Sequence, residues 1–437
     1  MPTRRELLAL TSGAAVTAAA GLAAPTAAHA AGTAHQDGDG DWTIPGWIAT
    51  WAAAPTTIPP NPPSAPIVLA NQTVRHVVHC SAGGDEIRIR VTNEFGNGPL
   101  RLGAVRVALR AGSGAGTATV PGTDRRVTFS NQAEVRIPAG SPLISDPVRL
   151  RVPPGADLVV SLYLPARTPV TTLAAFAFQD NVIADGDVTA ARTVTPVARV
   201  DQYLFLSGVS VRDRGAAIVT LGDSITNGAN TQNNLNHRWP DLLAARLRSS
   251  GLRRGIANVG ISGNRLLHDP NPAPGSDAES FAAYFGHSGL RRFDRDVIAQ
   301  PGAQFVVVLL GVNDLGHPGT VAPESETVTA DDLIGGHRQL IARAHAAGIV
   351  AIGATILPFK GDTLGFYTEA NERKRYVLNR WIRSGGEYDG VIDFDRAMGD
   401  PADPLRLNPA YDSGDHLHPN DAGMAAMADA VPLRLFK

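Results

Sequence analysis

The hydrophobic pattern of this 437-residue chain changes character once, near Asp213, and that change limits the folds open to it. Before Asp213, short segments alternate apolar and polar residues with a period of two, which is typical of half-buried strands. These segments are 86–91, 104–109, 135–137, 148–152 and 158–163. Turn signals separate them, and helical periodicity is nearly absent. We therefore predict an antiparallel β-sandwich domain over residues 31–212.

After Asp213, continuous apolar runs alternate with amphipathic segments. The expected strands are 216–221, 255–259, 305–310, 350–356 and 391–394, and the expected helices are 239–248, 332–347 and 369–383. Strands that alternate with helices form parallel sheets joined by right-handed crossovers. The pattern predicts an α/β fold, a three-layer α/β/α domain over residues 213–437, whose ligands bind at the carboxyl ends of the strands.

The charge balance narrows the class of partner. The net charge is -2, 18% of the residues are charged, and the basic side chains form no clustered stripe. Proteins that bind nucleic acid through its phosphates carry such a stripe. We expect no nucleic-acid partner, a neutral or small-molecule ligand, and a monomer.

Residues 1–30 have the features of an export signal. Arg4 and Arg5 precede a weakly apolar, alanine-rich run over 9–24, and residues 28–30 fit a small-x-small cleavage site. The arginine pair is similar to a twin-arginine leader, with an ordinary secretory signal as the alternative. No later run is long and apolar enough to span a bilayer. We expect a secreted, soluble protein.

Cys80 is the sole cysteine, so an intramolecular disulfide is impossible. A cysteine in a strand is usually a small buried residue, and we predict this role for Cys80. A reactive thiol, or a metal site shared with His76 and His79, are the alternatives.

A serine follows the strand 216–221 directly, at a sharp turn. Ser224 would therefore lie at the edge of the sheet where nucleophiles and ligands are found. A serine hydroxyl is a poor nucleophile at neutral pH. It needs a histidine base, an acid that orients the base, and hydrogen-bond donors for the developing oxyanion.

Other polar residues stand where they could supply these groups. Gly263 follows the second strand and could expose its backbone N–H, and Asn313 follows the third and could donate from its amide. Asp415 and His418 lie three residues apart in a turn. That spacing lets the carboxylate bind one imidazole nitrogen while the other nitrogen faces Ser224.

This ordered set resembles the four sequence blocks of the GDSL-type SGNH hydrolases, over roughly residues 215–432. Gly-Asp-Ser alone is a weak match, but Gly-x-Asn-Asp at 311–314 and Asp-x-x-His-Pro at 415–419 make it specific. The resemblance implies a flavodoxin-like three-layer hydrolase domain that cleaves carboxylic esters without a metal or other cofactor.

The same resemblance implies a role for each residue. Ser224 would be the nucleophile, His418 the base and Asp415 its orienting acid. The oxyanion hole would consist of the N–H groups of Ser224 and Gly263 and the side chain of Asn313. In the first half of the chain, segments 50–55, 81–84, 92–96 and 145–147 resemble an accessory jelly-roll-like domain of secreted actinobacterial members.

Rival assignments exist for several of these residues. Asp412 and His416 could form a second acid and base pair, but the family spacing favours Asp415 with His418. A metal site at residues 415–418 lacks further ligands with recognisable spacing. The α/β-hydrolase alternative requires Gly-x-Ser-x-Gly, which does not occur. Asp223 and Asp314 are interpreted as scaffolds for their turns.

The substrate is the least constrained part of the prediction. The polar loop 227–237 suggests a polar alcohol portion such as a sugar, although exposed loops are polar without such a role. We expect an ester hydrolase acting on small-molecule or polysaccharide esters, possible substrates being acetyl or other acyl esters of carbohydrates. Lipid or aryl esters, a carbohydrate-binding protein with an inert hydrolase domain, and an acyltransferase remain alternatives.

Overall fold

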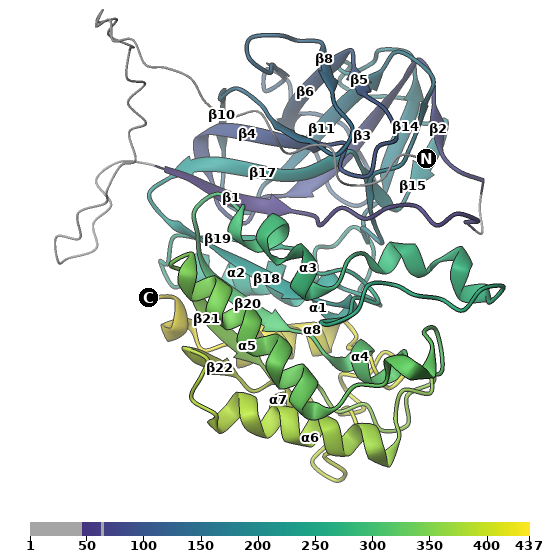
Figure 1. The fold of residues 1–437 in the computed structure, drawn as a ribbon. Helices are drawn as coiled ribbons and strands as arrows, with labels where there is room; N and C mark the ends of the chain where they lie inside the picture. The colour runs from purple at the N-terminus through teal and green to yellow at the C-terminus, as the bar shows by residue number, and fades with distance from the viewer. Residues whose placement is uncertain (1–45, 63–64) are drawn as a thin grey trace, which may run out of the picture. The chain divides into compact units, whose positions relative to one another are not determined.

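Antiparallel sheets fill the first half of the chain in the computed structural model, which describes residues 46–62 and 65–437 (Figure 1). The first sheet consists of β1 (Gly46–Ala52), β17 (Leu206–Asp213), β4 (Gly84–Thr92) and β10 (Val148–Val152), with β9 (Pro142–Ile144) paired to β4. The second sheet consists of β15 (Ala198–Val200), β14 (Asn181–Asp185), β3 (Gln72–His79), β11 (Asp157–Leu164), β6 (Ala104–Leu109) and β7 (Arg125–Val127). We refer to residues 46–213 as the β domain.

Three short strand pairs complete the β domain. They join β2 (Val68–Leu69) to β12 (Thr168–Pro169), β5 (Leu100–Leu102) to β8 (Val135–Ile137), and β13 (Leu173–Ala175) to β16 (Gln202–Leu204). The core of the domain lies between the two large sheets. Ile87 and Ile89 on β4 are fully buried and share one apolar cluster with Leu158 and Val160 on β11. The alternation predicted from the sequence thus places one face of each sheet in a common core.

A five-stranded parallel sheet lies at the centre of the second half, which we call the α/β domain, residues 214–437. Its order is β19 (Arg254–Asn258), β18 (Ala216–Gly222), β20 (Ala303–Leu309), β21 (Val350–Ala354) and β22 (Gly390–Ile392). All seven residues of β18 are buried, as expected for a central strand covered on both faces. The predicted fold class, an α/β domain preceded by an all-β domain, is confirmed.

Helices cover both faces of this sheet. One apolar cluster packs β18 and β20 against α3 (Gly289–Phe293), α5 (Ala330–Ala346) and α6 (Glu369–Ser384). Another packs the opposite face against α2 (Trp239–Ser249), α7 (Phe394–Met398) and α8 (Asp421–Ala430). Figure 1 shows α5 and α6 lying across the sheet on the side that faces the viewer.

The predicted elements differ from the structure mainly at their ends. The strand expected over 350–356 ends at Ala354, and the one expected over 391–394 ends at Ile392. Phe394 instead opens α7, because Asp393 caps that helix by accepting a hydrogen bond from the N–H of Arg396. A capping box of Thr329 and Asp332 starts α5 two residues earlier than expected.

The two domains pack along β1 and β19. The N–H of Ala49 donates to the carbonyl of Pro301 at 2.8 Å, and the N–H of Ile256 donates to Oγ of Ser81 at 2.7 Å. At Gly255, a Cβ atom would lie 2.1 Å from the carbonyl oxygen of Ala49, so only glycine permits this approach. The described residues accordingly lie within one compact unit.

Several expectations concern charge, membranes and cysteine chemistry. The predicted export signal, residues 1–30, lies outside the described residues. Among the described helices, none has the length and apolarity that a bilayer crossing requires.

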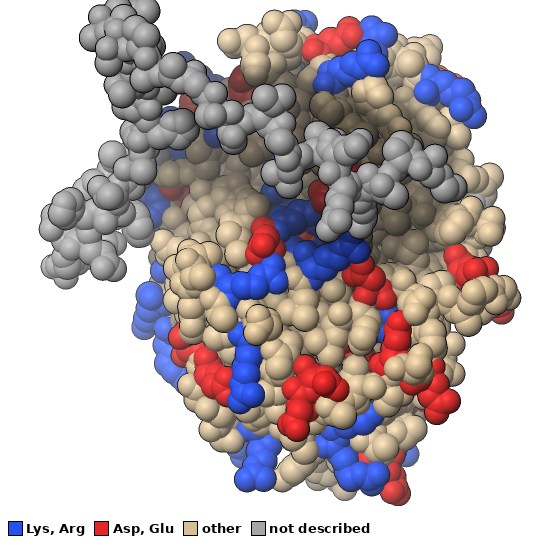
Figure 2. Space-filling view, in the orientation of Figure 1, with Lys and Arg blue, Asp and Glu red and all other residues tan. Residues whose placement is uncertain are grey.

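Within 46–62 and 65–437, no three His, Cys, Asp or Glu side chains gather in a way that could hold a metal ion. Cys80 is fully buried directly after β3, as predicted. Figure 2 shows acidic and basic side chains interspersed over the face in view.

Candidate active site

Ser224 lies at the turn between the central strand β18 and the short helix α1 (Ser224–Asn227). The turn is tight because Asp223 caps the helix, its carboxylate accepting a hydrogen bond from the N–H of Ile225 at 3.0 Å. The scaffold role predicted for Asp223 is thus confirmed. Gly222 has no space for a side chain, since a Cβ would lie 2.1 Å from Oγ1 of Thr226. Ser224 is 8% exposed, so its hydroxyl lies at the floor of the site.

The structure brings Ser224, His418 and Asp415 together. Oγ of Ser224 lies 2.7 Å from Nε2 of His418, and Nδ1 of His418 lies 2.6 Å from Oδ2 of Asp415. An ionised carboxylate can only accept hydrogen bonds, so Nδ1 carries the proton and Nε2 is free to accept one from the serine. This is the arrangement that activates a serine hydroxyl as a nucleophile.

Asp415 is held as a carboxylate by several donors. Oδ1 accepts the N–H groups of Leu417 and His418, at 3.0 and 2.8 Å, and Oδ2 accepts the side-chain amide of Asn230 at 2.9 Å. Burial alone raises the pKa of Asp415, but the hydrogen bonds from His418 and the backbone more than offset it. The pKa of Asp415 therefore lies well below its ordinary value, and the group stays ionised beside His418.

The rival pair of Asp412 and His416 also exists in the structure. Nδ1 of His416 is hydrogen-bonded to Oδ2 of Asp412, and the N–H of His416 donates to Oδ1 of the same residue at 3.0 Å. The side chain of His416 is 43% exposed, against 12% for His418. Because Ser224 contacts His418, the second pair lies beside the nucleophile's base without touching the nucleophile.

Each of the three predicted oxyanion donors has an N–H hydrogen without a partner among the described residues. The N–H groups of Ser224 and Gly263 have no hydrogen-bond partner among the described residues. The side-chain amide of Asn313 is buried and donates one hydrogen to the carbonyl of Asn264 at 2.9 Å, which leaves its second hydrogen available. Donors that no protein group satisfies are available to a ligand, so these groups fit a site that receives an oxyanion.

The structure explains why residue 263 is a glycine. Its φ is +77°, a left-handed conformation that favours glycine, and a Cβ there would lie 2.1 Å from the ring of Phe285. The Phe285 ring also contacts His317 at 5.3 Å between ring centroids, and His317 contacts Phe366 at 5.5 Å. Burial lowers the pKa of His317 to about 3, so this histidine is a neutral member of an aromatic wall.

The carboxylate of Asp314 connects the segment that follows Asn313 to the segment that follows Gly263. Its carboxylate accepts the N–H groups of Leu266 and Leu267, at 2.7 and 2.9 Å, and so joins the segment after Asn313 to the segment after Gly263. Burial raises the pKa of Asp314 to about 6. Asp314 is thus a scaffold residue, as predicted, and its hydrogen-bond partners lie in the neighbouring loop.

Arg292 is a buried residue of the site that no sequence motif singled out. Its guanidinium donates to the carbonyls of Gly222 and Val259, at 3.0 and 2.6 Å, and to Oδ1 of Asn264 at 3.0 Å. Arg292 therefore holds the carboxyl ends of β18 and β19 together. Burial lowers the pKa of Arg292 to about 10, and Asp296 balances its charge at 3.1 Å. An arginine four residues before an aspartate is commonly a surface ion pair.

Most polar side chains of the loop 227–237 form hydrogen bonds with other residues of the protein. Asn230 binds Asp415, and Asn234 accepts a hydrogen bond from the N–H of Asp180 in the β domain at 2.7 Å. Gln232 and His237 both bind Asp421, which lies at the start of α8. The loop therefore links the β domain, α8 and the acid beside His418, and its composition alone does not indicate a sugar site.

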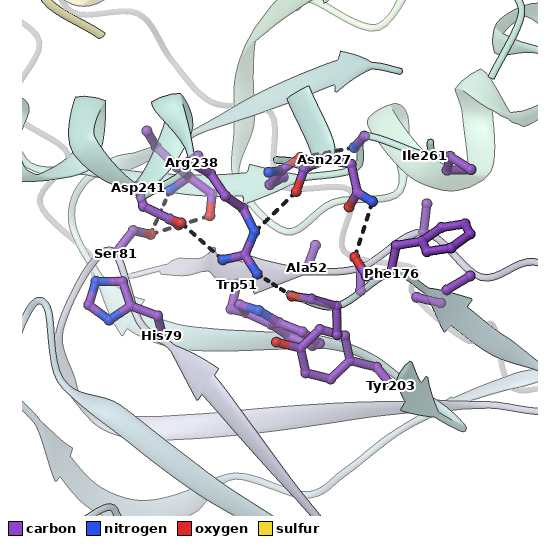
Figure 3. A pocket seen from close by; sticks show the side chains of 18 of the residues that line it. Trp51, Ala52, His79, Ser81, Phe176, Tyr203, Asn227, Arg238, Asp241 and Ile261 are labelled. Carbon is purple, nitrogen blue, oxygen red and sulfur yellow. Dashed lines mark hydrogen bonds and ion pairs between the residues drawn. The ribbon is translucent and has the colours of Figure 1, made fainter. Parts of the chain in front are cut away.

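A separate cavity lies between the two domains (Figure 3). Its walls include Trp51 and Tyr203 of the β domain and Arg238 of the α/β domain, and its volume is about 40 Å³. Roughly three water molecules would fill such a space. It borders Asn227 at the end of α1 but not Ser224 or His418, so it is not the space in which Ser224 would meet a substrate.

One family model and several solved structures match parts of this chain. The family described as "GDSL-like Lipase/Acylhydrolase family" matches residues 220–426. A search of curated proteins found no match. Similar solved structures include a lipolytic protein of the G-D-S-L family from Desulfitobacterium hafniense, 19% identical, covering 49% of this chain and 97% of that one with a TM-score of 0.34. An acetylxylan esterase from Geobacillus stearothermophilus is 20% identical, covering 51% of this chain and 95% of that one with a TM-score of 0.36.

The family match falls on the half of the chain that carries the parallel sheet. It begins in β18, four residues before Ser224, and ends in α8, after His418. The C-terminal half of this protein therefore carries a GDSL-like lipase/acylhydrolase domain, which is a carboxylic ester hydrolase domain.

Proposed function

We propose that the protein hydrolyses carboxylic esters through an acyl-enzyme formed on Ser224, and that its substrates are short acyl esters of carbohydrates. The observation that supports the serine mechanism is the hydrogen-bonded series of Ser224, His418 and Asp415 beside unpaired donors. A domain without catalytic activity would not require the side chains of Ser224, His418 and Asp415 to be hydrogen-bonded to one another. The same donors and acceptors serve each step below.

In the first step, Oγ of Ser224 attacks the ester carbonyl carbon while Nε2 of His418 takes the serine proton. The carbonyl oxygen becomes an oxyanion, which accepts hydrogen bonds from the N–H groups of Ser224 and Gly263 and from the amide of Asn313. Asp415 stabilises the imidazolium through Nδ1 and prevents the ring from turning. His418 then gives its proton to the departing alcohol oxygen, leaving an ester on Ser224.

In the second step, water attacks the acyl-serine carbonyl while His418 takes a proton from it. The oxyanion hole is used again, and collapse of the intermediate breaks the bond to Oγ of Ser224. His418 returns the proton to Oγ, and the carboxylic acid leaves. Each oxyanion donor is worth about 3 kcal/mol of barrier.

The aromatic wall beside Gly263 supports a short acyl group. The ring of Phe285 lies against the backbone of Gly263, and His317 and Phe366 close the space behind it. A cavity bordered by Gly263, Phe285 and His317 has a volume of about 10 Å³, which is room for about one water molecule. A long acyl chain would have to displace these rings.

A hydrolysis series on purified protein tests the proposal. p-Nitrophenyl esters from acetate to palmitate would be compared with acetylated xylan and methyl ferulate, with Ser224→Ala as the control for each. We expect the highest kcat/KM at acetate, a steep fall with acyl length, and acetate release from the glycan. Turnover by Ser224→Ala, or a maximum at a long acyl chain, would contradict the mechanism or the acyl size respectively.

We also propose that the protein is exported, with residues 1–30 as a twin-arginine signal. The support is the arrangement of Arg4, Arg5 and the small-x-small site at 28–30. Replacing Arg4 and Arg5 by lysine should block the appearance of the protein in the culture medium. Unchanged export would favour an ordinary secretory route.

A further inference from the structure

Three consecutive carbonyl groups of the β domain are held by donors of the α/β domain. The carbonyl of Phe176 accepts the side-chain amide of Asn227 at 3.2 Å, and that of Phe178 accepts the N–H of Asn234 at 3.0 Å. Between them, the carbonyl of Ala177 accepts the guanidinium of Arg238. The backbone of residues 176–178 is therefore fixed from the side of the active site.

The backbone of this segment is also strained. Phe176 has a φ of +57° and Phe178 a φ of +48°, in the left-handed region that non-glycine residues seldom adopt. Such strain persists only where the surrounding structure over-determines the backbone, and it concentrates at ligand clamps and active sites. Here the three carbonyl acceptors supply that over-determination, and the strained backbone aims one aromatic ring outward.

That ring belongs to Phe176, which is 37% exposed. It lies against Tyr284 of the α/β domain, with 6.2 Å between ring centroids and an interplanar angle of 79°. Figure 3 shows the Phe176 ring on the side of Asn227 and Ile261, pointing away from Trp51 and Tyr203. Tyr284 is partly buried and packs against the core of the β domain, so Phe176 is the exposed member of the pair. An exposed aromatic ring held in a fixed position fits a surface that is covered by a ligand.

Two short segments connect Phe176 and Tyr284 to the residues around Ser224. Asn227 ends the helix that Ser224 begins, so the two residues are separated by about 5 Å along the helix axis. Tyr284 directly precedes Phe285, whose ring packs on Gly263 of the oxyanion segment. The pair is thus connected both to the helix that Ser224 begins and to the segment of Gly263.

We propose that Phe176 and Tyr284 form an aromatic subsite, contributed in part by the β domain, which binds a sugar ring in the alcohol portion of the substrate. The inference rests on the ester hydrolase function proposed above and adds the residues that select the alcohol. The acyl side of Gly263 is closed by Phe285 and His317, whereas the Phe176 ring is open to solvent.

The chemistry around Phe176 favours a sugar over an alkyl chain. A sugar ring has an apolar C–H face that packs on an aromatic ring and a polar edge that stays hydrated. Phe176 has such mixed surroundings, because exposed polar residues such as Gln232 and Asn233 lie on the loop that binds its segment. An alkyl chain would need a continuous apolar groove.

The experiment compares Phe176→Ala with Phe176→Tyr, which keeps the ring, and with Phe178→Ala, which removes the other strained phenylalanine of the segment. The readout is the ratio of kcat/KM for acetylated xylo-oligosaccharides to kcat/KM for p-nitrophenyl acetate. We expect Phe176→Ala to lower this ratio by roughly three- to tenfold, mainly through KM, since an aromatic contact is worth that much. Phe176→Tyr and Phe178→Ala should leave the ratio near that of the wild type.

A binding measurement separates affinity from turnover. In the Ser224→Ala background, adding Phe176→Ala should raise the Kd for the acetylated oligosaccharide by a similar factor, measured by calorimetry. Tyr284→Ala provides a second variant should Phe176→Ala fold poorly, which its Tm would reveal, and it should act in the same direction.

The outcomes distinguish the two proposals. A wild-type protein without esterase activity would overturn the proposed function. An active wild type whose ratio and Kd are unaffected by Phe176→Ala and Tyr284→Ala would overturn the subsite alone. An equal loss in Phe176→Ala and Phe178→Ala would assign the effect to the backbone segment, and a loss confined to aryl esters would replace the sugar by an aromatic group.

Discussion

Two aspartate and histidine pairs lie within residues 412–418, and they share a pattern of hydrogen bonds although their spacings are four and three residues. In each pair the carboxylate accepts both Nδ1 and the backbone N–H of its histidine: Asp412 does so for His416 and Asp415 for His418. The difference lies at Nε2, which meets Ser224 in the second pair. A short turn can therefore build an oriented imidazole, but only its surroundings make that imidazole a catalytic base.

The largest expected effect separates the two histidines. His418→Ala should lower kcat by about four to six decades, because the serine loses its base. His416→Ala should change kcat by less than about threefold, as expected for an exposed side chain. Steady-state hydrolysis of p-nitrophenyl acetate measures both. Equal losses in the two variants would show that both pairs contribute to catalysis.

Replacing Asp415 should lower kcat more than replacing Asp412, and the difference should be smaller than for the two histidines. Asp415→Asn should lower kcat by about four decades, because the amide favours the wrong tautomer of His418. Asp412→Asn should act mainly on stability, since Asp412 also accepts the N–H of Gly414 at 2.8 Å. Tm and kcat measured on the same preparations separate these effects. A kcat loss in Asp412→Asn without a change in Tm would contradict this assignment.

Asn313→Ala tests the other side of the reacting carbonyl. Losing one oxyanion donor should lower kcat by about two to three decades with little change in KM. The folded state should survive, because the amide makes one hydrogen bond, to Asn264. Normal turnover in this variant would remove Asn313 from the oxyanion hole.

Asn230→Ala sharpens the comparison between the two carboxylates, because Asn230 donates to Asp415 and not to Asp412. Loss of a hydrogen bond to a charged group costs about 1.5–3 kcal/mol when buried, and less at this exposed position. We expect kcat to fall about three- to tenfold with KM unchanged. Asn233→Ala, an exposed neighbour in the same loop, serves as the matched control.

Asp223 should show the smallest kinetic effect and a distinct pH dependence. Burial raises the pKa of Asp223 to about 7 from an ordinary value of 3.8. The unfolded chain therefore ionises first, and this group lowers the free energy of unfolding as pH rises from about 4 to 7. Asp223→Asn keeps the acceptor for Ile225 and removes that penalty, so the variant should gain stability relative to the wild type across this window. Urea unfolding at pH 4 and pH 8 measures the difference, and a constant offset would contradict it.

Much of the fold was predictable because its signals are local. The run 216–221 is apolar except at Thr220, which is typical of a central parallel strand, and β18 is buried throughout. The alternation at 86–91 likewise predicted which face of β4 enters the core. The element ends were less predictable, because caps such as Asp393 and Thr329 compete with the strand and helix patterns around them.

The supporting residues were beyond local prediction. Arg292 joins carbonyls that precede it by 70 and 33 residues in the chain, and Asn230 binds a carboxylate 185 residues away. Neither residue stands in a motif. Phe176 acquires its strained backbone from donors in the other domain, so its own sequence context carries no sign of that conformation.

Residue type, spacing and the resemblance they carry predicted a GDSL-type hydrolase domain and selected Ser224, Asp415 and His418, which the structure brings together. A strand end, a turn and a three-residue spacing are properties of short segments, so the sequence alone can show them. The contact between Ser224 and His418 depends instead on packing between distant segments. Asp412 accepts the same two hydrogen bonds from His416, but this pair is separated by four residues and His416 has a φ of +60°. Only the packing of β18, α1 and α8 decides that the imidazole of His418 meets Ser224.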